Sequence, residues 1–135
     1  MTQSHIQRRK APDPWIRPQR ILVVDDDPII RDMMVDLLES EGYTPLLTRN
    51  GQEALRLLQG PGNYLVFLDL MMPTFSGKDL CVSLAAQPHV RQRHILVLMS
   101  AMDNLDETER LDIDMLMPKP FLIEDLEEAL ETYMR

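Results

Sequence analysis

The residues best suited to chemistry in this chain are acids that follow apolar runs. Asp25 and Asp26 come directly after Ile21–Val24, and Asp69 comes directly after Tyr64–Leu68. Continuous apolar runs rich in β-branched residues are typical of strands buried on both faces of a parallel sheet. Functional sites in such sheets lie beyond the carboxyl ends of the strands. We therefore expect these three carboxylates to lie close together.

A hydroxyl group and a lysine follow two further apolar runs. Ser100 comes after Ile95–Met99, and Lys119 lies just beyond Met115–Met117. Clustered carboxylates raise each other's pKa unless a cation lies among them. Mg²⁺ prefers one or two carboxylates and water molecules as ligands, and a lysine beside a hydroxyl suits a phosphoryl group. The pattern indicates phosphoryl transfer with a carboxylate as the acceptor.

Helical segments separate the strands that must position these groups. Asp27 and Pro28 have the residue types of an N-cap and a first helical residue, and Gly42 is expected to end that helix. Pro45 places the second strand at a sheet edge. The alternation predicts an α/β domain with a mostly parallel sheet and right-handed crossovers. Besides the helix that starts at Pro28, we expect helices at 51–58, 77–86, 104–110 (short) and 123–134, and strands at 21–24, 43–47, 64–68, 95–99 and 115–117.

Two of the predicted helices carry apolar residues at helical spacing, which predicts an inward face. We interpret Cys81 as an inert core thiol. The three histidines show no metal-ligand spacing. The expected inward residues are Leu80, Cys81 and Leu84 in one helix and Ile123, Leu126, Leu130 and Tyr133 in the last.

The length and composition fit one globular domain. The chain has 135 residues, of which 44% are apolar, enough to build a hydrophobic core. No apolar run approaches the roughly 20 residues that a membrane helix needs, and the N-terminal region is not a secretory signal. The single cysteine excludes an internal disulfide framework. We expect a cytoplasmic protein with no membrane partner.

Charge is unevenly distributed along the chain. The net charge is −8, but residues 1–20 contain five basic residues and one acid, which leaves −12 on residues 21–135. Because an acidic body repels phosphates, we expect no nucleic-acid partner for it. Residues 1–19 contain three prolines and no periodicity, which predicts a flexible basic tail. We interpret Trp15 as packing loosely on the body or staying free of it, with anchoring of a partner or a second subunit as the alternative.

Four motifs in order resemble the receiver domain of two-component response regulators, of the chemotaxis-regulator type. The resemblance covers residues 20–135 and implies a flavodoxin-like, doubly wound, five-stranded parallel sheet. Its implied strand order is 2-1-3-4-5, with helices on both faces. The motifs are Val24-Asp25-Asp26, Leu68-Asp69-Leu70-Met71-Met72-Pro73 with Gly77, Met99-Ser100-Ala101, and Lys119-Pro120-Phe121.

The resemblance also implies a role for each acid. Asp69 is implied as the phosphoacceptor that attacks the phosphohistidine of a sensor histidine kinase or a phosphotransfer protein. Asp26, Asp69 and the backbone carbonyl of Met71 are implied as direct Mg²⁺ ligands, and Asp25 acts through a metal-bound water. The expected protein is therefore a phospho-acceptor signalling domain that assists its own phosphorylation and dephosphorylation, not an enzyme.

Three further residues are implied to bind the phosphoryl group. Ser100 is expected to donate a hydrogen bond to the phosphoryl oxygens, together with the backbone N–H of Ala101. Lys119 is expected to pair with the phosphoryl group. The bond between Lys119 and Pro120 is expected to be cis.

Two departures from the family pattern concern the output surface. Leu116 stands where the family usually has an aromatic switch residue, and the stretch from Ser100 to Lys119 is shorter than usual. The fourth helix is therefore expected to be short or atypical. In the family that helix, the fifth strand and the last helix bind downstream partners and form dimers. We expect an unknown downstream protein and a possible homodimer, without assuming the standard dimer.

The residues leave other interpretations open. A pseudo-receiver that binds partners without phosphorylation fits Leu116 and the weak fourth helix. A haloacid-dehalogenase-type phosphatase also uses an aspartate nucleophile and faintly resembles Asp25-x-Asp27, but Pro28 and Ile29 stand where a threonine is needed. Because the chain stops at Arg135 after the last predicted helix, we expect either a single-domain regulator or a fragment of a longer protein.

Overall fold

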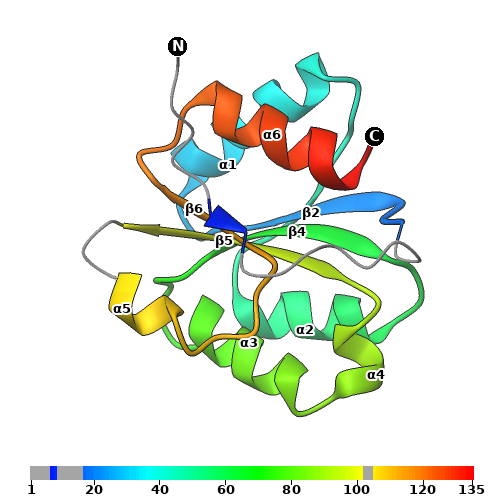
Figure 1. Ribbon diagram of the computed structural model, residues 1–135, viewed down its shortest axis with the longest axis vertical. Coiled ribbons are helices and arrows are strands. Elements are labelled where there is room, and N and C mark those ends of the chain that lie inside the picture. Colours follow the sequence, from blue (N-terminus) through cyan, green and yellow to red (C-terminus); the bar gives the residue numbers. More distant parts are fainter. Residues whose placement is uncertain (1–6, 9–16, 102–104) are drawn as a thin grey trace.

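A six-stranded sheet forms the centre of the computed structural model (Figure 1), which describes residues 7–8, 17–101 and 105–135. Its strand order is β1-β6-β5-β4-β2-β3. All neighbouring strands pair in parallel except β1, which is antiparallel to β6. The strands are β1 (Gln7–Arg8), β2 (Arg20–Val24), β3 (Leu46–Thr48), β4 (Tyr64–Asp69), β5 (Ile95–Ala101) and β6 (Met115–Lys119).

Helices cover both faces of this sheet. In Figure 1, α1 and α6 lie on one face, and α2, α3, α4 and α5 lie on the other. The helices are α1 (Pro28–Ser40), α2 (Gly51–Gln59), α3 (Gly77–Ala85), α4 (Pro88–Arg91), α5 (Leu105–Thr108) and α6 (Ile123–Tyr133). None of the helices in the described residues is long and apolar enough to cross a membrane.

The predicted five-stranded parallel sheet is confirmed. The order β3-β2-β4-β5-β6 is the predicted order 2-1-3-4-5. The expected edge strand lies at the sheet edge, but it begins at Leu46 rather than at Tyr43, after Pro45. The predicted short fourth helix is also confirmed, because α5 has only four residues.

Three details of the sequence prediction were wrong or incomplete. Gln7–Arg8 forms a strand in a segment where no regular element was expected; most of that segment, Trp15 included, lies outside the described residues. The helix Pro88–Arg91 was not predicted. Ile123 is 43% exposed, so the buried face of α6 does not include it. The residues that α6 buries are Asp125, Leu126, Ala129, Leu130 and Tyr133.

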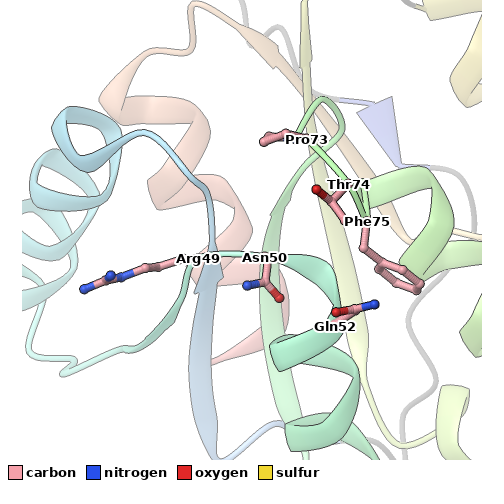
Figure 2. A pocket seen from close by; sticks show the side chains of 6 residues that line it. All are labelled: Arg49, Asn50, Gln52, Pro73, Thr74 and Phe75. Atoms are coloured by element: carbon pink, nitrogen blue, oxygen red, sulfur yellow. The ribbon is translucent and has the colours of Figure 1, made fainter.

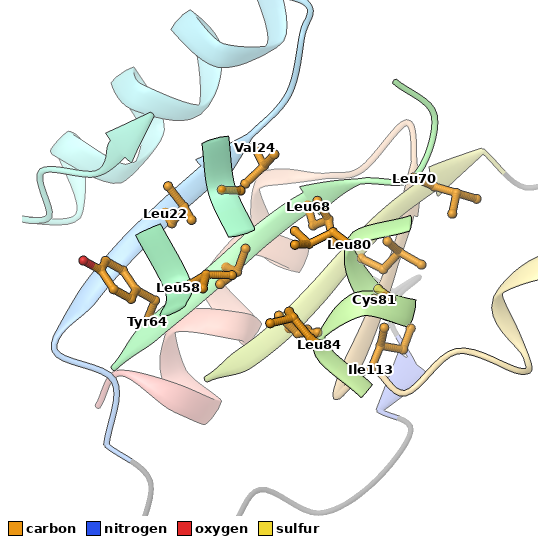
Figure 3. Close-up of a cluster of buried hydrophobic side chains, with 14 of the residues drawn as sticks. Leu22, Val24, Leu58, Tyr64, Leu68, Leu70, Leu80, Cys81, Leu84 and Ile113 are labelled. Atoms are coloured by element: carbon orange, nitrogen blue, oxygen red, sulfur yellow. The ribbon is translucent and has the colours of Figure 1, made fainter. Parts of the chain in front are cut away.

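Each face of the sheet has its own apolar core. Even-numbered strand residues such as Leu22 and Leu68 pack under α2 and α3, and odd-numbered ones such as Val23 and Phe67 pack under α1 and α6. This alternation follows from the two-residue period of a strand. Figure 3 shows the first core, where α3 buries the three residues predicted to point inward, Leu80, Cys81 and Leu84. Burial raises the pKa of the Cys81 thiol to about 12, so the thiol stays protonated at neutral pH.

A buried ion pair joins α4 to the start of β6. The guanidinium of Arg91 lies 2.9 Å from Asp114 Oδ2. The same carboxylate oxygen accepts a hydrogen bond from the Leu96 backbone N–H at 2.8 Å. The charged groups therefore satisfy one another inside the protein, as buried charges must.

His94 lies beside this ion pair, and its neutral ring joins α2 to the start of β4. Its Nδ1 accepts a hydrogen bond from the Tyr64 backbone N–H at 3.2 Å, and its Nε2 lies 2.9 Å from the Leu58 carbonyl. Because Nδ1 is an acceptor here, the proton of the neutral ring is on Nε2, which donates to Leu58. Burial lowers the pKa of His94, so the imidazole stays uncharged.

Candidate functional site

The strand ends bring the three predicted acids together. One carboxylate oxygen from each of Asp25, Asp26 and Asp69 lies within 4.8 Å of the other two. Asp25 is fully buried, Asp69 is 7% exposed and Asp26 is exposed. The cluster thus has a buried floor and an open side toward solvent, where a charged ligand can enter.

Asp25 is held by the turn that leads into α1. Its Oδ1 accepts a hydrogen bond from the Asp27 backbone N–H at 2.9 Å, and its backbone carbonyl accepts one from Arg31 Nη1 at 2.8 Å. Asp27 itself serves as the N-cap of α1, because its Oδ1 accepts from the Ile29 N–H at 2.9 Å. As predicted, Asp27 caps the helix, whereas Asp25 and Asp26 lie in the acidic cluster.

Lys119 projects from the end of β6 into the same cluster. Its Nζ lies 3.1 Å from Asp69 Oδ1 and 3.6 Å from Asp25 Oδ2. Burial raises the pKa of Asp69, the Lys119 ammonium opposes that rise, and the charge of Asp25 adds to it. One ammonium thus contacts two of the three clustered carboxylates, which leaves the site with excess negative charge.

The donor set fits a hard divalent cation. The clustered ligands are all carboxylate oxygens, which Mg²⁺ prefers. Asp25 Oδ2 is fully buried and has no hydrogen-bond partner, although a buried carboxylate oxygen without one is costly. A cation or a cation-bound water at the cluster would supply both the missing partner and the missing charge.

The loop after Asp69 folds back tightly against the site. The Met71 N–H lies 3.4 Å from Asp69 Oδ1, and the Gly77 N–H donates to the Leu70 carbonyl at 3.1 Å. A Cβ at Gly77 would collide with the Asp69 carbonyl and lie 2.9 Å from Leu70 Cα. Only glycine allows α3 to begin this close to the phosphoacceptor candidate.

The same loop contains a backbone conformation that is rare for its residue type. Thr74 has a φ of 70°, which is costly for a β-branched residue. Thr74 lines a cavity of about 290 Å³ between this loop and the start of α2, shown in Figure 2. Gly51 anchors the loop there, because its N–H donates to the Phe75 carbonyl at 3.2 Å. None of the predicted site residues lines this cavity, so it is separate from the acidic cluster.

Ser100 and Ala101 lie next to the cluster at the end of β5. Ser100 follows Met99, the register partner of Asp69, and Ala101 pairs with Lys119. The Ser100 hydroxyl donates to the Ala101 carbonyl at 3.2 Å, so it is not bonded to a carboxylate. The expected cis bond between Lys119 and Pro120 is present.

Leu116, which stands at the family's aromatic position, is fully buried in the core under α3. Its register partners are Leu98 on β5 and Gln7 on β1. A leucine enclosed in this way differs from a ring that swings between exposed and buried positions. This supports the expectation that the output side of the domain is atypical.

The ion pair between Lys119 and Asp25 has no signal in the sequence, because it depends on the approach in space of two residues 94 positions apart. Sequence reasoning also gave no reason for Gly77, whose close approach to Asp69 depends on three-dimensional contact. The signal available for Gly77 was its position at the start of a predicted helix shortly after Pro73.

Comparison with known proteins identifies the family. Residues 21–131 match the family model described as the response regulator receiver domain. The chain is 37% identical over 125 residues to a probable transcriptional regulatory protein of Picosynechococcus sp., which covers 86% of this chain and 49% of that protein. It is 34% identical over 119 residues to the DNA-binding response regulator MtrA of Mycolicibacterium smegmatis, covering 87% and 51%.

Solved structures of receiver domains have the same fold. The response regulator TrrA of Thermotoga maritima, in complex with Mg²⁺–BeF, is 28% identical with a TM-score of 0.71 over 85% of this chain and 98% of that one. The receiver domain of the Francisella response regulator 1452 is 27% identical with a TM-score of 0.72, covering 84% and 95%.

The chain spans about half the length of the curated relatives it matches. The match at residues 21–131 of this chain covers all four motifs and the acidic cluster at the carboxyl edge of the parallel sheet. The chain therefore belongs to the response regulator receiver domain family of two-component signalling.

Proposed function

We propose that Asp69 accepts a phosphoryl group from the phosphohistidine of a sensor histidine kinase or a phosphotransfer protein. The observation that carries this proposal is the meeting of Asp25, Asp26 and Asp69 within 4.8 Å, with Lys119 3.1 Å from Asp69. A carboxylate nucleophile beside a cation site and an ammonium group is suited to phosphoryl transfer.

Mg²⁺ is the proposed cofactor. Asp26, Asp69 and the backbone carbonyl of Met71 would hold it directly, and Asp25 would bind it through a water molecule. The bound cation would supply charge neutralisation, lowering the repulsion between the incoming phosphate and the carboxylates. The structure of TrrA with Mg²⁺–BeF supports this assignment by similarity.

The transfer step needs an ionised Asp69. One Asp69 carboxylate oxygen attacks phosphorus while the bond between phosphorus and the histidine nitrogen breaks, and the electron pair of that bond returns to the imidazole of the donor. The products are an acyl phosphate on Asp69 and a free histidine, so no oxidant or further reactant is needed. Lys119, already 3.1 Å from Asp69, favours the ionised form of the attacking carboxylate and then pairs with the new phosphoryl oxygens.

Ser100 and Ala101 provide the remaining hydrogen bonds. The Ser100 hydroxyl must leave the Ala101 carbonyl, to which it now donates at 3.2 Å, and turn toward the phosphoryl group. The Ala101 N–H provides a second donor. This exchange of one hydrogen bond for another is a local change that can shift a partner-binding surface between two conformations.

The proposed consequence is altered partner binding on the side formed by α5, β6 and α6. Lys119 is the last residue of β6, so a movement of Lys119 at the site also moves a strand of this surface. The helix α5 on the same side has only four residues. The downstream partner is proposed to be a protein, because the acidic body disfavours nucleic acid.

Binding without phosphorylation is the alternative that a specific observation favours. Leu116 is fully buried where the family has its aromatic switch, so that position has no ring to reorient. A haloacid-dehalogenase-type phosphatase is disfavoured, because Asp27 is engaged as the N-cap of α1 by the Ile29 N–H.

A small phosphodonor with and without Mg²⁺ tests the proposal. Wild type and the surface control Asp32→Asn are expected to gain one phosphoryl group by intact mass when Mg²⁺ is present, and Asp69→Asn is expected to gain none. Phosphorylation of Asp69→Asn to the wild-type level would refute the assignment. No phosphorylation of wild type with any donor would favour the pseudo-receiver.

A further inference from the structure

The strand β1 closes the β6 edge of the sheet with very few contacts. Gln7 lies opposite Leu116 and Arg8 opposite Met115, in an antiparallel pair of two residues. An unpaired strand edge is a template for another chain. A cover this short is held by few backbone hydrogen bonds, each of small net value, so it can open and close.

The hydrogen bonds of β5 show which residues of β6 turn their backbone N–H and C=O groups toward the outer edge of the sheet. The Leu96 N–H points toward β6, because it donates to the Asp114 carboxylate at 2.8 Å. Alternation along β5 then turns Leu98 toward β6 as well, so the backbone groups of Leu116, its parallel partner, point to the outer edge. Gln7, opposite Leu116, is therefore the residue that exchanges both N–H···O bonds with β6.

Pro118 limits what else can pair with this edge. It occupies the next outward position along β6 and has no N–H to donate. A long edge-to-edge ladder between two β6 strands is therefore blocked just beyond Leu116. The segment that fits the short outward stretch is the one already seated there, Gln7–Arg8.

The connection from β1 to β2 is long enough for β1 to pair with β6 of its own chain or with β6 of a second copy. In the strand order, β2 lies four positions from β1, which is about 19 Å at the usual strand spacing. The eleven residues 9–19 can span up to about 40 Å when extended. A short strand on a long connector is well suited to exchange between two identical chains.

We propose that β1 exchanges between copies: Gln7–Arg8 of one chain pairs with β6 of a second copy, and the second copy returns the same contact. This twofold arrangement repeats the pairing already seen within one chain, so it needs no new complementary surface. It also joins two copies at the strand whose end carries Lys119. The inference goes beyond the proposed function and does not depend on phosphorylation.

Deleting residues 9–15 tests the exchange by shortening the connector. The four residues left between β1 and β2 span at most about 17 Å, too short to close within one chain. Sedimentation velocity is expected to show dimerisation at least tenfold tighter than for the full chain, and adding Gln7→Pro to the deletion is expected to return a monomer. A monomeric deletion variant, or a dimer that Gln7→Pro leaves intact, would overturn the proposal.

The full chain provides a second test that does not require the deletion variant to fold. Gln7→Pro removes the N–H that bonds Leu116, whereas Gln7→Ala keeps it. At high concentration the dimer fraction is expected to fall with Gln7→Pro and to stay unchanged with Gln7→Ala. A rise with Gln7→Pro would mean that uncovered β6 edges pair directly, and absence of a dimer in every form would mean that β1 pairs only in its own chain; either result overturns the proposal.

Discussion

The ammonium of Lys119 lies 3.1 Å from Asp69 Oδ1, although the two residues are 50 positions apart in the chain. Lys119 also lies 3.6 Å from Asp25 Oδ2, which has no hydrogen-bond partner. One cation on β6 therefore links the acids at the ends of β2 and β4. The Lys119 ammonium lowers the pKa of Asp69 and so opposes the desolvation that raises it.

Replacing Lys119 with methionine is expected to slow phosphorylation by a small phosphodonor about 100-fold, because one preorganised group that stabilises the developing charge is lost. Mg²⁺ affinity is expected to stay equal or to increase, since a positive charge near the cluster is removed. Phosphorylation rates and Mg²⁺ titration measure the two effects.

Lys78→Met is the matched control for that variant, because Lys78 is an exposed lysine on α3 and its replacement changes the net charge equally. The control is expected to phosphorylate at the wild-type rate. Equal slowing in both variants would show that Lys119 acts only through net charge.

Mg²⁺ is expected to stabilise the fold through the acidic cluster. A ligand that binds only the folded state at 100 times its Kd adds about 2.7 kcal/mol to the free energy of unfolding. Asp26→Ala is expected to lose this gain, whereas Asp32→Ala, which removes an exposed acid of α1, is expected to keep it. Urea unfolding with and without Mg²⁺ measures the difference, and equal stabilisation of both variants would contradict the site.

Gly77→Ala is expected to lower the free energy of unfolding by about 2–3 kcal/mol, because its Cβ would collide with the Asp69 backbone and overpacking costs that much. It is also expected to slow phosphorylation by displacing Asp69. Gly60→Ala is the control: its Cβ would lie 3.3 Å from the Leu57 carbonyl, and we expect a change below about 1 kcal/mol. Equal stability of the two variants would show that the loop can move aside.

Stability is expected to fall in mildly acidic solution because of His94. Burial lowers the pKa of His94 below its ordinary value of 6.5, so below that pH the unfolded chain binds the proton more readily than the folded one. The free energy of unfolding therefore falls as the pH decreases through about 6.5 and recovers as the pH rises. Urea unfolding from pH 8 to pH 5 measures this slope.

The comparison variants for this slope are His94→Gln and His89→Gln. The slope is expected to be reduced in His94→Gln and retained in His89→Gln, whose histidine lies exposed on α4. A wild-type slope in His94→Gln would assign the acid sensitivity to other groups.

The parallel strands could be predicted from the sequence, because their continuous apolar runs need burial on both faces of a sheet. The clustering of the three acids could also be predicted, since the carboxyl ends of parallel strands lie at one edge of a sheet. The roles of Asp69, Ser100 and the other site residues remain predictions, which the phosphorylation experiments test.

The elements that sequence reasoning missed depend on contacts between distant segments. Gln7–Arg8 has no strand pattern of its own and becomes a strand only against β6. The helix Pro88–Arg91 is too short for a periodic signal. Its Arg91 forms an ion pair with Asp114, which lies 23 residues later in the chain. Ile123 has the right spacing for the buried face of α6, but it begins the helix and remains 43% exposed.

The most direct test of the central claim is to locate the phosphoryl group after reaction with a small phosphodonor and Mg²⁺. Borohydride reduction of the acyl phosphate followed by peptide mass spectrometry identifies the modified residue. We expect the label on Asp69 alone, and only when Mg²⁺ is present. A label on Asp25 or Asp26, or equal labelling of Asp69 without Mg²⁺, would contradict the account.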